Sequence, residues 1–244
     1  MTALEFDPGG IASPPDPKDH SVPLDESIAV PRRWIIGPNT KYSMAPVTNQ
    51  GKLPECGGYT GIDVMRYHGK VAGDGVLNLD PHWLYRRAQT RDGIPLPHRG
   101  TTARGVLQTL RLEGVPEIAK PGSAARGSAA RNMIGSYGRL PFTAGAITTA
   151  LVQYEGPIVI GMAWPASFFH PVRGLAPQPS GERYGHLLEL IGKDDNVAGG
   201  SALLQNHWRE TWGQGGRIWI PWRWLLPLIH DAWKVLDAGV SVKP

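Results

Sequence analysis

The chain has 244 residues, a formal net charge of +4 and a hydrophobic share of 41%, proportions of a globular protein with one domain or two small lobes. The longest apolar run, near residues 157–169, is broken by Gly161 and Pro165 and is too short to cross a bilayer. The arginines are scattered and do not line one helix, as a nucleic-acid surface would require. We therefore expect neither a membrane nor a nucleic-acid partner.

The chain has a single cysteine, which cannot form an internal disulfide and fits a reducing compartment. The N-terminal residues contain no basic stretch followed by an apolar one, the pattern of a secretory signal. We expect a cytoplasmic monomer, with export by a non-classical route left open.

Residues 1–30 are rich in Pro, Gly, Asp and Ser and lack a hydrophobic period, which predicts an extended or disordered N-terminal arm. From Cys56 onward, apolar residues recur at helical spacing, so a helix is predicted to begin near the cysteine. A second helix is predicted to open at residues 80–81, where a proline follows an aspartate. A third is predicted from a cap at Thr101 or Thr102 to Gly114.

The unit GSAAR occurs twice over residues 122–131, which is too few copies for a solenoid and favours an exposed helix or connector. A helix is predicted over residues 143–154. Four apolar segments separated by glycine turns then predict a meander of antiparallel strands, at 157–164, 186–195, 201–208 and 217–222. Helices first and strands second indicate an α+β fold with a boundary near residue 140.

Three motifs place Cys, His, Asn and Gln in the pattern of an activated thiol: Gln50 precedes Cys56 by six positions, His186 opens an apolar strand, and Asn206 precedes His207 and Trp208. A free thiol is mostly protonated at neutral pH, so a nucleophilic cysteine needs a helix N-terminus and a nearby imidazolium. An asparagine oxygen can hold that imidazole in one tautomer, and a glutamine amide can donate to an oxyanion.

These motifs resemble those of papain-like cysteine peptidases, in particular the short, disulfide-free bacterial type. Val47-Thr-Asn-Gln50-Gly resembles the family's V-x-x-Q-G, and Cys56 follows at the family's spacing. Asn206-His-Trp208 with Trp212-Gly213 and Gly216 resembles N-S-W-G-x-x-W-G-x-x-G. The similarity covers roughly residues 45–235. It implies a two-lobed fold with a mainly helical lobe at 31–140, a β-sheet or barrel lobe at 141–244, and an active-site cleft between them.

The resemblance also implies a cysteine-type endopeptidase that acts on peptide or protein substrates through a thioester acyl-enzyme, without a metal or cofactor. It assigns Cys56 as nucleophile, His186 as base and acid, Asn206 as the residue that orients His186, and Gln50 as oxyanion donor. Residues expected to contact substrate are Gly100, Thr101, Leu187 and Trp208. The other histidines, at positions 20, 68, 82, 98, 170 and 230, are interpreted as core or surface residues.

Three positions depart from the family pattern without removing a catalytic group. Gly57 stands where tryptophan is common, His207 where serine is common, and Arg209 where glycine is common. Glu55 beside the thiol has two interpretations, a carboxylate that tunes the thiol's pKa or substrate preference, or an exposed loop carboxylate.

Two other functions remain open. A protein with this fold can use its cleft for binding without turnover, although the complete set of four catalytic residue types speaks against it. The same thiol can also serve another acyl transfer, such as amide hydrolysis on a cell-wall peptide or transpeptidation.

Overall fold

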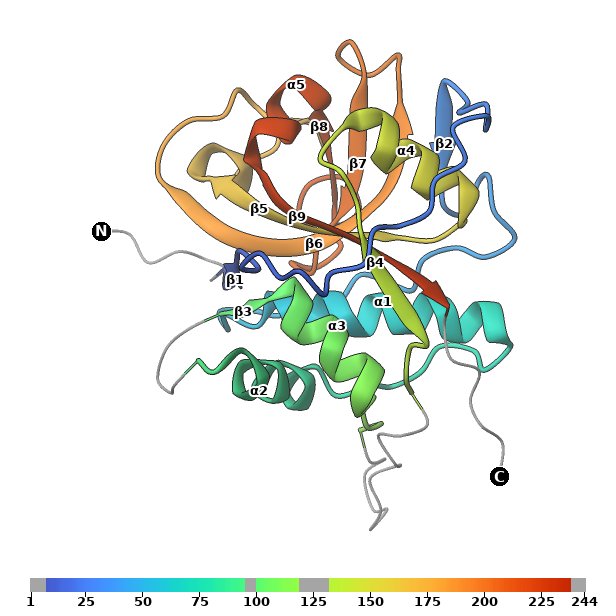
Figure 1. The fold of residues 1–244 in the computed structure, drawn as a ribbon. Helices are drawn as coiled ribbons and strands as arrows, with labels where there is room; N and C mark the ends of the chain where they lie inside the picture. Colours follow the sequence, from blue (N-terminus) through green and yellow to red (C-terminus); the bar gives the residue numbers. More distant parts are fainter. Residues whose placement is uncertain (1–7, 95–99, 119–131, 238–244) are drawn as a thin grey trace.

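A seven-stranded sheet lies against three helices in the computed structural model, which describes residues 8–94, 100–118 and 132–237. The helices are α1 (Cys56–Ala72), α2 (Pro81–Asp92) and α3 (Ala103–Leu112). Figure 1 shows them below the sheet, with the N-terminal segment running along the boundary. The predicted α+β, two-lobed fold is confirmed.

The helices begin where polar caps and the cysteine predicted them. α1 starts at Cys56. At α2 the side chain of Asp80 accepts the backbone N–H of Trp83 at 3.0 Å, so one unpaired donor of the first turn is satisfied. At α3 the cap is Thr102, which accepts the N–H of Gly105 at 2.8 Å. That helix ends at Leu112, slightly before the predicted end at Gly114.

The predicted meander is confirmed as β5 (Ile158–Pro165), β6 (Arg183–Asp194), β7 (Ser201–Gln205) and β8 (Arg217–Pro221), each antiparallel to the next. The helix predicted before it is α4 (Ala144–Gln153). A strand that the sequence patterns did not reveal, β9 (Ile229–Asp237), returns to pair with the other side of β5. Short helical turns connect these strands, at Ala166–Phe169, Trp222–Leu225 (α5) and Leu226–Leu228.

The sheet also recruits two strands from the range predicted for the helical lobe. β2 (Arg33–Ile35) pairs with β6, and β4 (Ser136–Arg139) pairs with β9. Strand pairing between distant segments thus brings residues near both ends of the range 31–140 into the sheet. The repeated GSAAR unit at 122–131 lies outside the described residues.

Two apolar clusters stabilise the fold. One lies within the sheet lobe and includes the fully buried Trp164 and Phe168. The other fills the space between the three helices and the sheet, where Leu187 and Trp233 from the strands pack with Leu107 and other helix residues. Because the second cluster draws residues from both layers, it fixes the position of α1 relative to β6.

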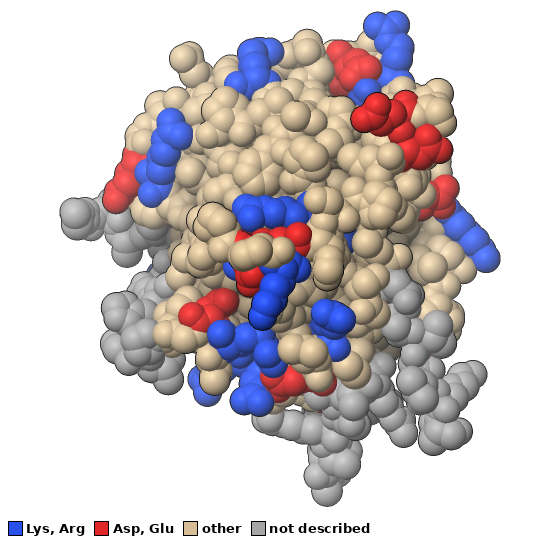
Figure 2. Space-filling view, in the orientation of Figure 1, with Lys and Arg blue, Asp and Glu red and all other residues tan. Residues whose placement is uncertain are grey.

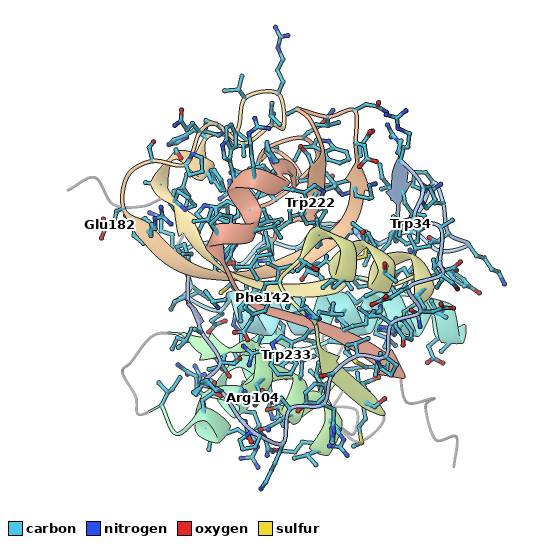
Figure 3. All side chains as sticks on the ribbon, turned by 45° about the horizontal axis from the view of Figure 1, so that its top comes forward. Trp34, Arg104, Phe142, Glu182, Trp222 and Trp233 are labelled. Carbon is cyan, nitrogen blue, oxygen red and sulfur yellow. The ribbon has the colours of Figure 1, made fainter. Side chains whose placement is uncertain are left out.

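The N-terminal arm is held against the body of the protein in its described part, residues 8–30. β1 (Gly10–Ile11) pairs in parallel with β3 (Thr101–Thr102). The N–H of Ser13 donates to Asp231 at 2.8 Å, and Arg104 donates to Asp19 at 2.8 Å. Figure 3 shows Arg104 close to Trp233, and its guanidinium lies 5.7 Å from the indole centre. The described part of the arm is therefore extended and is anchored by hydrogen bonds and ion pairs.

Acidic and basic side chains alternate over the face that the arm crosses, as Figure 2 shows. Within the part of the chain that the structure describes, no helix is both long and apolar enough to span a membrane.

Lys234 on β9 is fully buried, and its side-chain nitrogen donates a long hydrogen bond of 3.4 Å to the carbonyl of Pro157. Burial lowers the pKa of Lys234 to about 7, from 10.5. Between these values the unfolded chain carries a proton that the folded chain has released, so this lysine makes stability rise with pH from 7 to 10.5.

We expect Lys234→Met to stabilise the protein most near pH 7 and to remove this slope, which for one proton is roughly 1 kcal/mol per pH unit. Urea unfolding of both chains at pH 7, 8 and 9 measures the difference between them. A difference that stays constant with pH would contradict the buried-lysine interpretation.

Candidate active site

Cys56 lies at the first position of α1 and is fully buried. The N-terminus of a helix carries partial positive charge, which favours the thiolate form of a cysteine. Glycines around it allow the helix to approach its neighbours closely: a Cβ added to Gly57 would lie 2.5 Å from Thr101, and one added to Gly58 would lie 2.2 Å from the carbonyl of Pro81. The tryptophan common at position 57 in the resembled family has no room here.

His186 and Asn206 are joined by a hydrogen bond of 2.9 Å between Nε2 and Oδ1. Asn206 Oδ1 also accepts the N–H of His207 at 2.9 Å, which fixes the oxygen as the acceptor and places the histidine proton on Nε2. Among the described residues, His186 Nδ1 has no hydrogen-bond partner. The neutral ring therefore presents an unprotonated Nδ1, the nitrogen that can accept a thiol proton.

Aromatic rings enclose this pair. Trp208 stacks on His186 with ring centres 4.8 Å apart, and Trp164 meets the same ring edge-on at 5.1 Å. His186 is fully buried, and this burial lowers its pKa to about 4, although the hydrogen bond that Nε2 donates to Asn206 opposes the shift. With the arm in place, burial therefore favours the neutral ring of His186 over the imidazolium that an activated thiol needs.

Gln50 is hydrogen-bonded to His207, the residue that follows Asn206. Its backbone N–H donates to the carbonyl of His207 at 2.9 Å, and its Oε1 lies 2.6 Å from His207 Nδ1. Its Nε2 donates to the carbonyl of Leu53 at 2.7 Å. These contacts bring Gln50, which precedes α1, to the loop that contains Asn206, the hydrogen-bond partner of His186.

The exposed-loop interpretation of Glu55 is wrong. Its carboxylate is paired with Nδ1 of His82 and is mostly buried, so it is not an exposed loop residue. His82, interpreted from sequence as a core or surface residue, lies at the start of α2 and also meets the ring of Tyr59 edge-on. The side chain of Glu55 thus serves as a link between α1 and α2.

The arm passes directly over the thiol. The N–H of Gly9 donates to Cys56 Sγ at 3.3 Å, and the carbonyl of Gly9 accepts the N–H of Thr101 at 3.0 Å. A Cβ added to Gly9 would lie 2.1 Å from the carbonyl oxygen of Pro54, and one added to Gly10 would lie 2.7 to 2.9 Å from the backbone of His186. Only glycine fits at both positions, and Figure 1 shows β1 between β3 and β6.

The four residues predicted to contact substrate fall into two groups. Gly100 and Thr101 lie at the edge that the arm occupies, where a Cβ on Gly100 would meet the carbonyl of Gly9 at 2.5 Å. Asp92 fixes this edge by accepting the hydroxyl of Thr101 at 2.5 Å. Leu187 and Trp208 are fully buried, one in the core shared by the two layers and the other against His186.

Sequence reasoning missed two features of the site. The double glycine at 9 and 10 was visible, but the contact of the arm with the thiol depends on the pairing of β1 with β3. His207 was noted only as a departure from serine, although it binds Gln50. No group of three or more His, Cys, Asp or Glu suited to a metal ion occurs among the described residues.

Comparison with solved structures places this fold among papain-like cysteine proteases. Xylellain, a cysteine protease from Xylella fastidiosa, is 18% identical with a TM-score of 0.79, over 96% of this chain and 97% of that one. A cysteine protease of Carica candamarcensis in complex with E-64 is 17% identical with a TM-score of 0.63, over 85% and 99%. Procathepsin B from Trypanosoma congolense is 13% identical with a TM-score of 0.69, over 90% and 83%. No family model matches the sequence, and a search of curated proteins finds no match.

Replacing both arm glycines tests whether the arm covers the thiol in solution. In Gly9→Ala/Gly10→Ala each new methyl group meets backbone atoms that cannot rotate away, so the arm should leave the cleft. If the substitutions destabilise the covered state by about 1.4 kcal/mol, the fraction of molecules with an uncovered thiol rises roughly tenfold. Alkylation of Cys56 by iodoacetamide should accelerate accordingly.

Gly145→Ala is the matched control, because a Cβ there meets no atom within 4 Å. It should alkylate at the rate of the parent chain. Equal rates in the double variant, the control and the parent would show that the arm does not protect the thiol.

Proposed function

We propose that this protein is a cysteine endopeptidase in which Cys56 is the nucleophile, His186 the base and acid, Asn206 the residue that orients His186, and Gln50 an oxyanion donor. The observation that carries the proposal is the bond from His186 Nε2 to Asn206 Oδ1, which leaves Nδ1 for a thiol. The fold supports it, because the first turn of α1 lies against β6, where a Cβ added to Gly57 would meet Leu187 at 3.2 Å.

Each catalytic step then uses a group in this site. The thiolate of Cys56 attacks the carbonyl carbon of the peptide, and the electron pair of the carbonyl moves to its oxygen. That oxyanion accepts hydrogen bonds from Gln50 Nε2 and from the backbone N–H of Cys56. His186 gives its proton to the departing nitrogen as the carbon–nitrogen bond breaks, which leaves a thioester. His186 then takes a proton from water as the water oxygen bonds to the thioester carbon. The carbon–sulfur bond breaks, which releases the peptide with a new carboxyl group and restores the thiolate.

The path of the arm favours endopeptidase over exopeptidase activity. The described chain continues on both sides of the thiol, from Pro8 through the two glycines to Ser13. A cleft that accommodates an uninterrupted chain can accept the middle of a polypeptide. The substrate proposed is therefore a peptide or protein in extended conformation, which takes the place of the arm beside Gly100 and Thr101.

Labelling with an epoxide or vinyl-sulfone electrophile tests the nucleophile. In the Gly9→Ala/Gly10→Ala chain, mass mapping should find one modified residue, Cys56, and peptide hydrolysis should stop as labelling completes. Cys56→Ala should lose both labelling and turnover, and His186→Ala should lose nearly all turnover while the fold survives, as measured by circular dichroism. Rapid labelling of Cys56 without hydrolysis of any peptide would favour a binding protein, and amide or transpeptidation products would favour another acyl transfer.

The pH dependence should differ between the covered and uncovered sites. Once the arm leaves, a thiolate–imidazolium pair lowers the thiol pKa below about 8.5 and raises the imidazole pKa above about 6.5. The rate kcat/KM of the double glycine variant should then be bell-shaped, falling in acid as the thiolate is protonated and in alkali as the imidazolium loses its proton.

In the parent chain burial lowers the pKa of His186 to about 4, so no imidazolium faces the thiol at neutral pH. Its slow alkylation should rise steadily toward alkaline pH, as for an ordinary thiol. A steady rise in the uncovered variant as well would contradict the ion pair and the mechanism built on it.

A further inference from the structure

His207 is a fully buried histidine whose two ring nitrogens both have polar partners. Nδ1 lies 2.6 Å from Gln50 Oε1, and Nε2 lies 3.1 Å from the hydroxyl of Thr60 on α1. Its ring centre is 5.5 Å from that of His186. The residue thus lies between the proposed base and the proposed oxyanion donor and contacts helix α1 as well.

The hydrogen bonds of Gln50 determine which nitrogen of His207 carries the proton. Gln50 Nε2 donates to the carbonyl of Leu53 at 2.7 Å, so the other amide atom facing His207 is the oxygen, which can only accept. His207 Nδ1 must therefore donate. Nε2 is then the acceptor in a neutral ring, and the hydroxyl of Thr60 donates to it. Burial lowers the pKa of His207 well below 6.5, although a hydrogen bond with the backbone of Leu187 opposes the shift, so the ring is neutral at physiological pH.

The donor on His207 also determines the orientation of the Gln50 amide. Rotation about the last side-chain torsion of glutamine is soft and roughly two-fold, so the amide oxygen and nitrogen exchange places easily. A flipped amide would face the carbonyl of Leu53 and any substrate oxyanion with its own oxygen. His207 Nδ1 opposes this flip, because it would then face an N–H group. The amide of Gln50 therefore keeps its Nε2, and not its oxygen, on the side away from His207.

We propose that His207 is a positioning residue that holds the amide of Gln50 in its donating orientation, and that Thr60 fixes the tautomer of His207 that does so. This inference rests on the proposed peptidase function. It assigns a task to a residue that departs from the serine of the resembled family, and it makes His207 act through Gln50, without touching the substrate.

Kinetics of full-length variants in the Gly9→Ala/Gly10→Ala chain test the inference. His207→Leu removes the donor and should lower kcat on the order of 10-fold, less than complete loss of an oxyanion donor costs, with KM almost unchanged. His207→Asn places an amide N–H near the position of Nδ1 and should recover most of that loss. Iodoacetamide alkylation of Cys56 involves no oxyanion and should proceed equally fast in all three chains.

A double-mutant cycle separates positioning from general structural damage. In the presence of Gln50→Ala, His207→Leu should cause no further loss of kcat, because the amide that it positions is gone. His68→Leu is the control for loss of a histidine with a buried ring nitrogen, since His68 packs against Tyr67 on α1 away from Gln50. His68→Leu should retain the kcat of the Gly9→Ala/Gly10→Ala chain.

The outcomes distinguish this inference from the proposed function. If the Gly9→Ala/Gly10→Ala chain hydrolyses no peptide, the function and the inference both fail. If that chain is active, three results overturn the inference alone. They are an unchanged kcat in His207→Leu, a loss of kcat from His207→Leu that is equally large when Gln50→Ala is present, and a loss in His207→Asn as large as in His207→Leu. Should His207→Leu not fold, Thr60→Val replaces it: kcat should fall by about 2- to 5-fold, a fraction of a full oxyanion contact, and an unchanged kcat overturns the inference.

Discussion

The site depends on one constraint, the close packing of the first turn of α1 between the helices and the sheet. Gly57 and Gly58 lack side chains where the backbone of α2 and the side chains of β3 and β6 approach within contact distance. A Cβ at Gly58 would lie 2.2 Å from the carbonyl oxygen of Pro81, a backbone atom, so a larger residue there would push the helix outward. The thiol of Cys56 would then no longer lie beside the start of β6, where His186 is held. Close packing thus requires the two glycines that follow the cysteine.

The same close packing also permits a hydrogen-bond network between the two lobes. Thr60 on α1, His207 after β7 and Gln50 before α1 are joined by hydrogen bonds of 3.1 and 2.6 Å. All three are buried, and buried polar groups are expensive unless each donor has an acceptor. The neutral tautomer of His207 satisfies the network at both ring nitrogens. The same hydrogen bonds that stabilise the interface therefore orient the proposed catalytic amide.

The arm changes the electrostatics of the site as well as its access. With Gly9 and Gly10 in place, the thiol and His186 are both removed from water. An imidazolium is costly in such surroundings, which is why burial lowers the pKa of His186 to about 4. A thiolate–imidazolium pair needs solvent or a polar substrate nearby to form. Leaving of the arm would thus both open the cleft and permit the charge separation that the proposed chemistry uses.

The sequence by itself determined the local features, because caps, glycines and hydrophobic periods act over a few residues. Asp80 and Thr102 marked helix starts, the strands of the meander were readable, and Gln50, Cys56, His186 and Asn206 stood out by residue type and spacing. Tertiary structure alone decided that β2 and β4 join the sheet, that β9 returns to β5, that Glu55 pairs with His82, and that the arm covers the thiol. Each of these depends on pairing between segments far apart in the chain, for which neighbouring residues carry no signal. The protonation of His186 was also beyond the sequence, since it follows from burial by residues drawn from several elements.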